Sequence, residues 1–127
     1  MEATGNELRL RALTEQVIGG FYDTYNALGH GFLEVVYENS LAVLLRERGL
    51  HVQTQIPIGV RFRGQIVGEF RADMLVEECL LIEIKAASNL APIHEAQLLH
   101  YLKATGIQVG LLFNFGPRPQ FRRRVFS

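Results

Sequence analysis

Two strongly apolar stretches with one amphipathic segment between them constrain the fold of this chain most. LLIEIKA (80–86) and IQVGLLFNF (107–115) are nearly continuous in apolar residues, which is typical of strands buried on both faces. The intervening APIHEAQLLHYLKATG (91–106) has helical spacing, with Pro92 suited to the first turn and Gly106 to the end. A helix between two such strands predicts a crossover with parallel strands. The sequence therefore predicts an α/β fold.

Two helices are predicted ahead of the first strand. Apolar residues recur at helical spacing over 7–28 and again over 32–48. Gly29 or Gly31 can take the left-handed conformation that ends the first helix, and Gly49 ends the second. Both helices should flank the central sheet.

Residues 51–77 are predicted to form a hairpin that turns at Gly64. Pro57 indicates that its first strand lies at a sheet edge or carries a bulge. A second turn leads into strand 80–86, so three strands should form an antiparallel meander. Alternation places the apolar residues of the first strand on one side: Val52, Ile56, Ile58, Val60 and Phe62.

After the crossover, PRPQ (117–120) is expected to be a loop and FRRRVF (121–126) a short final strand. The predicted order is α-α-β-β-β-α-β-β in a single domain over residues 1–127. No linker or internal repeat interrupts it.

Glu83 and Lys85 interrupt the apolar strand 80–86. Residues two apart in a strand point to the same face, so these side chains lie about 6.5 Å apart. A turn at Glu77–Glu78 brings Asp73, on the preceding strand, near the level of Glu83 or Lys85. Charges on an apolar sheet face are costly unless they pair or bind an ion.

This charged triplet allows two interpretations. The first is a structural salt bridge between Lys85 and one of the carboxylates. The second is a Mg²⁺ site, because Mg²⁺ commonly takes one or two carboxylates and keeps several waters. Asp73 and Glu83 would supply the carboxylates and Ile84 a carbonyl oxygen, with Mn²⁺ as a substitute ion. Lys85 would orient or deprotonate a water for in-line hydrolysis of a phosphodiester.

Several separated segments resemble one nuclease superfamily. GEFRADMLVEECLLIEIKA followed by HEAQLLHYLKATG resembles the core of the PD-(D/E)XK nucleases, with the motif aspartate at Asp73 and E-x-K ending at Lys85. Ala72 stands where the motif has proline. GHGFLEVVYENSL is similar to the signature of the GxxExxY proteins, a branch placed in that superfamily, and GLLFNFG also resembles this branch. The resemblance implies a restriction-endonuclease-like mixed sheet flanked by helices, and a Mg²⁺-dependent nuclease acting on DNA.

The resemblance also implies further site residues. Glu34 would be an additional acidic group near the metal, although a glutamate there also suits the first turn of a helix after a glycine N-cap. Gln97 would hold the attacking water or orient Lys85, and His94 is a candidate phosphate contact. Tyr37 either hydrogen-bonds a site carboxylate or a phosphate, or belongs to the core.

Net charge is zero, so no global attraction to nucleic acid is expected, but basic residues outnumber acidic ones from Arg61 onward. Arg71 on the hairpin, together with Arg61 and Arg63, is a candidate phosphate contact. On the last strand, alternation places Arg122 and Arg124 on one face and Arg123 on the other, and Arg122 and Arg124 are further candidate phosphate contacts.

The sequence contains no secretory signal and no apolar run near the length of a membrane span, so we expect a soluble, cytoplasmic protein without a membrane partner. Cys79 is the single cysteine, which fits a reducing compartment. A non-catalytic module that binds nucleic acid or protein on a nuclease-like fold is the alternative function. Because two active sites are often needed to cut both strands, a homodimer is a plausible assembly.

Overall fold

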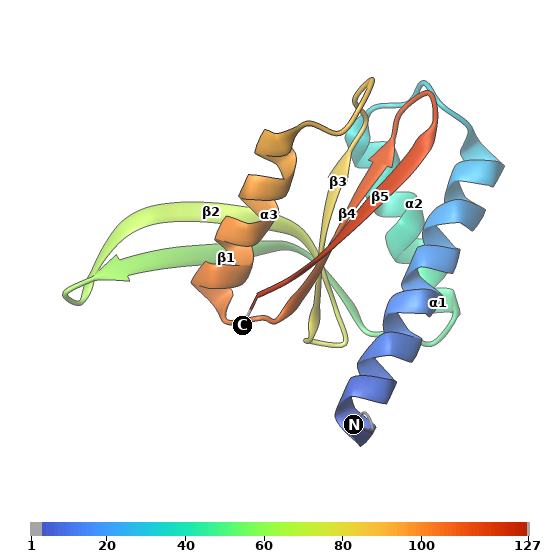
Figure 1. The fold of residues 1–127 in the computed structure, drawn as a ribbon. Coiled ribbons are helices and arrows are strands. Elements are labelled where there is room, and N and C mark those ends of the chain that lie inside the picture. Colours follow the sequence, from blue (N-terminus) through green and yellow to red (C-terminus); the bar gives the residue numbers. More distant parts are fainter. Residues whose placement is uncertain (1–3, 127) are drawn as a thin grey trace.

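The computed structural model describes residues 4–126 and contains three helices and five strands in that range. Their order along the chain is α-α-β-β-β-α-β-β, as predicted (Figure 1). The bounds are α1 Gly5–Leu28, α2 Glu34–Glu47, β1 Val52–Phe62, β2 Gln65–Val76, β3 Leu80–Lys85, α3 Pro92–Thr105, β4 Val109–Phe115 and β5 Pro119–Val125.

The strands form one mixed sheet in the order β1-β2-β3-β4-β5. β3 and β4 are parallel, joined by α3, and the other neighbouring pairs are antiparallel. This topology confirms the predicted crossover and the meander of the first three strands. It also confirms that β1, which carries Pro57, is an edge strand.

The sheet is covered on both faces. α1 and α2 pack on one face, where Ile82 and Ile84 of β3 join the larger apolar core. α3 packs on the other face, where Leu81 joins a second core with Leu98. The alternation of β3 therefore sends its odd-numbered residues, including Glu83 and Lys85, toward the face that α3 covers. No helix in residues 4–126 is both long and apolar enough to span a membrane.

The helix ends follow the sequence with one exception. α1 ends at Gly29 and α3 at Gly106, both with positive φ, as expected of C-terminal glycines. The expected glycine N-cap of α2 is wrong, because Leu33 holds that position. Glu34 is therefore the first residue of α2, where its charge suits the helix dipole.

The expectation that β1 has a single apolar side is wrong. Val52 packs in the core under α1 and α2, whereas Ile58 packs in the core under α3. Gln55, between them, has a φ of 55°, a left-handed conformation that breaks the alternation. In β2, Ala72 and Met74 likewise belong to different cores although they are two residues apart. Both strands of the hairpin thus turn over at the same level.

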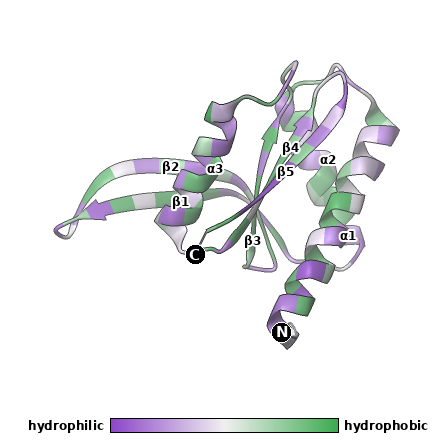
Figure 2. Cartoon of the chain, in the orientation of Figure 1, coloured by the Kyte–Doolittle hydropathy of each residue, from purple (hydrophilic) through white to green (hydrophobic). Residues whose placement is uncertain are grey.

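Beyond this point the hairpin leaves the sheet. β2 pairs with β3 only over Met74–Val76, whereas its pairing with β1 continues to the turn. We call residues 56–72 the arm; it curves beside α3 and projects beyond the rest of the molecule (Figure 1). Hydrophobic and hydrophilic segments alternate along it (Figure 2), and Phe62 near its tip is 65% exposed rather than buried.

The last strand is longer than predicted. β5 begins at Pro119, inside the segment expected to be a loop, because Pro119 pairs with Phe115 and Gln120 with Asn114. Its outer edge is the second free edge of the sheet.

Candidate active site

β2 and β3 separate at Asp73 and Glu83. The last paired residues are Met74 and Ile82, so the register places Asp73 opposite Glu83, one of the two levels expected. Side chains replace the backbone pairing at this point. The Asp73 N–H donates to Glu83 Oε2 at 2.7 Å, and the Ile84 N–H donates to Asp73 Oδ2 at 2.8 Å. Each carboxylate is therefore fixed by the backbone of the opposite strand.

The carbonyl of Ile84 points into the same gap. In a strand, the N–H and C=O of one residue point toward the same neighbour. Since the Ile84 N–H reaches Asp73, its carbonyl is directed toward β2 and away from β4. The opening between the strands thus collects two carboxylates and one backbone carbonyl.

The charge of this pair is poorly compensated. Glu83 is only 3% exposed. Burial, and then the neighbouring carboxylate of Asp73, raise the pKa of Glu83 to about 8. The hydrogen bond from the Asp73 N–H and the charge of Lys85 oppose this rise. A bound cation would offset the repulsion between the two carboxylates, which is the second of these causes.

A hollow of about 160 Å³ opens beside Asp73 and Ile84 on the side of α2. The N-terminus of α2 brings Glu34 to it, so the structure unites Glu34 with Asp73 and Ile84 as the family resemblance implied. The hollow is lined by Glu34, Val35, Glu38, Gln55, Asp73 and Ile84.

Sequence reasoning missed Glu38 and Gln55. Glu38 is only 7% exposed, and Gln55 Nε2 donates to its Oε1 at 2.7 Å. Burial, and then the charge of Asp73, raise the pKa of Glu38. The spacing of Glu34 and Glu38, one helical turn apart, was the available signal. No sequence signal indicated the contact of Gln55 with Glu38, because this contact depends on the left-handed conformation of Gln55 itself.

Lys85 points toward the face of the sheet that α3 covers, and Gln97 lies on α3. Lys85 shares a face of β3 with Glu83 and is half-buried. Gln97 Nε2 donates to the hydroxyl of Tyr101 at 3.2 Å. Burial, then Glu83 and Asp73, raise the pKa of Tyr101, so this face of α3 lies within electrostatic reach of the carboxylates. None of the ion pairs formed within residues 4–126 involves Lys85, which argues against the structural salt bridge.

The donor set fits Mg²⁺ better than a transition metal. Within residues 4–126, no three His, Cys, Asp or Glu side chains gather as they would to hold a metal ion between them. Two carboxylates and a carbonyl match Mg²⁺, which keeps several waters. Oδ2 of Asp73 and Oε2 of Glu83 accept backbone hydrogen bonds, which leaves the second oxygen of each carboxylate for a cation.

The other predicted residues have diverse partners. Arg122 and Arg124 both reach Glu95 of α3, Arg122 with its Nε 3.2 Å from Glu95 Oε1. His94 Nδ1 accepts from the Ala91 N–H at 3.0 Å, so its Nε2 is the atom open to other partners. Arg71 is exposed on the arm.

Tyr37 belongs to the core. It is fully buried and stacks on Phe115, with ring centroids 4.4 Å apart. Its hydroxyl donates to the Gly29 carbonyl and accepts from the Phe32 N–H. Tyr37 therefore holds the turn that presents Glu34, without contacting a site carboxylate itself.

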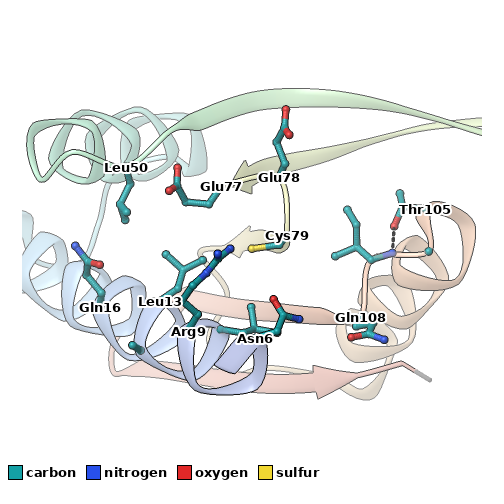
Figure 3. A pocket seen from close by; sticks show the side chains of 14 residues that line it. Asn6, Arg9, Leu13, Gln16, Leu50, Glu77, Glu78, Cys79, Thr105 and Gln108 are labelled. Carbon is teal, nitrogen blue, oxygen red and sulfur yellow. Dashed lines mark hydrogen bonds between the residues drawn. The ribbon is translucent and has the colours of Figure 1, made fainter. Parts of the chain in front are cut away.

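A larger hollow, of about 710 Å³, lies at the opposite end of β3 (Figure 3). It is enclosed by the N-terminal half of α1, the β2–β3 turn and the α3–β4 connection. Cys79 lines it, and burial raises the pKa of its thiol. None of the predicted site residues lines this hollow.

Comparisons with known proteins bear on the fold and on the family. Among curated proteins, none matches the chain. The solved structure of SSO0001 is 19% identical with a TM-score of 0.57, and the match covers 94% of this chain and 61% of that one. An alkaline exonuclease from Laribacter hongkongensis is 19% identical with a TM-score of 0.51, and the match covers 68% and 52%. This chain spans less than two thirds of either protein, and at this identity the likeness concerns the fold.

The family itself is shown by the sequence profile. The profile of the PD-(D/E)XK nuclease superfamily matches residues 11–125. This range includes all five strands, α2, α3 and all of α1 except its first turns, and therefore the whole opening between β2 and β3. The chain belongs to the PD-(D/E)XK nuclease superfamily.

Proposed function

We propose that this protein is a Mg²⁺-dependent nuclease that hydrolyses phosphodiester bonds in DNA. The observation that carries the proposal is the opening between β2 and β3, where Asp73 and Glu83 face each other and each accepts a hydrogen bond from the opposite strand. Membership of the nuclease superfamily supports a nucleic-acid substrate. Gly31, Glu34 and Tyr37 favour the GxxExxY branch.

Asp73, Glu83 and the Ile84 carbonyl would hold the ion. Their positions are set before any ion binds, because backbone N–H groups fix both carboxylates. Such preorganisation is what electrostatic catalysis requires. When bound, Mg²⁺ supplies positive charge against the phosphodiester and lowers the pKa of a coordinated water, and Mn²⁺ can do the same.

Lys85 and Gln97 would act on the attacking water. Lys85 stands on the same face of β3 as Glu83, so its ammonium can orient the water or, when neutral, accept its proton. Gln97 donates through its Nε2 to the Tyr101 hydroxyl, and its amide oxygen would bind the water.

Glu34 and Glu38 would support the site from α2. Glu34 is exposed at the rim of the hollow and can bind a water there. Glu38 is buried behind it and is tied to Gln55 at the level where the hairpin turns over. We assign Glu38 a positioning role for the opening in which Asp73 lies.

Cleavage of plasmid and linear DNA in Mg²⁺ tests this proposal. Lys85→Met and Asp73→Asn should each lower the cleavage rate by about two to four orders of magnitude. Lys103→Met and Asp23→Asn make the same chemical changes on the surface and should retain the native rate. Equal activity in all variants would contradict the proposal, and DNA binding without cleavage by the native protein would favour the binding module.

A further inference from the structure

The arm has one supported face and one open face. Its inner face packs on α3: Ile58 joins the core under that helix, and the ring centroids of Phe70 and His100 lie 4.8 Å apart. The outer face points the opposite way, toward the side of the sheet that α1 and α2 cover elsewhere, because the hairpin turns over at Gln55. α1 and α2 do not extend over the arm (Figure 1).

The outer face is hollowed. A groove of about 600 Å³ runs along it. Its floor is low because two residues with little or no side chain, Pro57 and Gly59, point toward it. An added Cβ at Gly59 would meet no atom within 4 Å. Their cross-strand partners Arg71 and Glu69 form one wall, and the Arg61–Ile66 pair lies toward the tip.

This groove leads to the candidate active site. Pro57 and Arg71 line the groove, and Gln55 and Asp73, two residues further along the same strands, line the hollow at the carboxylates. Two residues of a strand span about 6.6 Å, so the two hollows adjoin on the α2 side of the sheet. A chain molecule lying in the groove would reach Asp73 without crossing another element.

The arginines of the groove are available to a ligand. The ion pairs within residues 4–126 use Arg48, Arg122 and Arg124, so Arg61 and Arg71 have no carboxylate partner there. Both are exposed. By contrast, Arg122 and Arg124, on the far edge of the sheet, both form an ion pair with the carboxylate of Glu95. Of the arginines considered as phosphate contacts, Arg61 and Arg71 of the arm therefore have no ion-pair partner within residues 4–126 and lie along the groove that leads to Asp73.

We propose that the outer face of the arm is a track for the phosphate backbone of duplex DNA, with Arg61 and Arg71 as its phosphate contacts. This inference rests on the proposed nuclease function and adds where the substrate lies. From Asp73 to the level of Arg61 the arm spans roughly 20 Å. That length corresponds to about six base pairs of duplex on one side of the scissile bond.

Duplex binding without divalent ions tests the track apart from cleavage. The probe is a fluorescent DNA duplex of about 20 base pairs, titrated in EDTA between about 50 and 200 mM KCl. Arg61→Gln/Arg71→Gln should weaken binding several-fold and flatten the plot of log affinity against log salt by about two units, nearly one for each lost phosphate contact. Arg9→Gln/Arg11→Gln removes equal charge from exposed positions on α1 and should bind as the native protein does.

Cleavage of duplexes with different flanks supplies a second readout. For the native protein, KM should fall as the flank grows to about six base pairs and then stay constant, whereas the arm variant should lose this dependence and keep its kcat. An unchanged salt slope in the arm variant, or an altered oligomeric state with an unchanged slope, would overturn the track. If the salt slope is unchanged but the native protein cleaves DNA, the nuclease proposal stands and the track is wrong. If the native protein does not cleave DNA but the arm variant loses binding as predicted, the nuclease proposal is wrong and the track stands.

Discussion

The carboxylate of Glu83 is held where its charge is poorly compensated. It is buried, faces Asp73, and accepts one backbone hydrogen bond from that residue. A proton or a cation can relieve the repulsion between the two carboxylates, so the two compete for the same place. Cation affinity should therefore rise with pH through the range in which Glu83 ionises.

This competition predicts an unusual pH dependence of stability in the metal-free protein. Since the pKa of Glu83 is raised to about 8, the folded protein binds its proton more tightly than the unfolded chain does. The free energy of unfolding should consequently fall as pH rises from about 4.5 to about 8, by at most about 1.4 kcal/mol per pH unit for this group. Urea unfolding in EDTA at several pH values measures the slope.

Glu83→Gln is the matched variant for this measurement. Glutamine keeps an oxygen that can accept from the Asp73 N–H but does not titrate. Its stability should decline less between those pH values, with a remainder from Glu38, whose pKa is also raised. A slope equal to that of the native protein would show that Glu83 does not titrate in this range.

The residues that sequence patterns could identify are those fixed by regular geometry. Glu83 and Lys85 follow from strand alternation, and Asp73 from a tight turn at Glu77–Glu78, whose φ values are both positive. Glu38 and Gln55 could not be paired in this way. Their contact requires a left-handed residue in β1, and a glutamine gives no sign of that conformation in the sequence.

At the scale of elements, the end of β4 holds the segment that follows Lys85. Asn114 Oδ1 accepts from the Ala87 N–H at 2.8 Å, and its Nδ2 donates to the Ala87 carbonyl at 2.9 Å. Asn114 is fully buried and is the register partner of Lys85 on β4. The position of Lys85 at the end of β3 thus depends on a polar clamp from the neighbouring strand.

Gly116 is the tightest point of this clamp. A Cβ there would lie 2.0 Å from the Ala87 carbonyl oxygen, so the backbone after Lys85 must move to admit a methyl group. Gly116→Ala should therefore destabilise the protein by about 1–3 kcal/mol and lower the cleavage rate. Thermal unfolding and plasmid cleavage measure the two effects.

Gly19→Ala serves as the control for this substitution. It lies in α1, and an added Cβ there meets nothing within 4 Å. Alanine should stabilise the helix slightly at this position, with no effect on cleavage. A Gly116→Ala protein as stable and active as the native one would contradict the role given to the clamp.

Elements were predictable where one periodicity ran through a whole segment. The crossover through α3 and its end at Gly106 follow directly from the sequence. The two faces of the hairpin could not be predicted from the sequence. Both strands change faces at Gln55 and Asp73, while the apolar pattern of β1 continues unbroken in the sequence. β5 begins earlier than the sequence predicts, because Pro119 opens an edge strand, where its missing N–H costs little.

At the scale of the whole molecule, one departure from regular pairing links fold and site. The sheet is continuous from β3 to β5, and the hairpin leaves it where the carboxylates lie. On one side α2 brings Glu34 to the hollow beside Asp73, and on the other side α3 covers the face of the sheet toward which Glu83 points. The arm that departs from the opening supplies the open face on which we place the substrate.

Cation binding tests this account most directly. Calorimetric titration of Mn²⁺ into the metal-free protein near pH 8 should show one ion bound per chain, and Asp73→Asn and Glu83→Gln should each abolish that binding. Asp23→Asn, which removes a carboxylate from a surface ion pair, should bind as the native protein does. Mn²⁺ binding that survives in both site variants, or that is absent from the native protein, would contradict a metal site at the opening between β2 and β3.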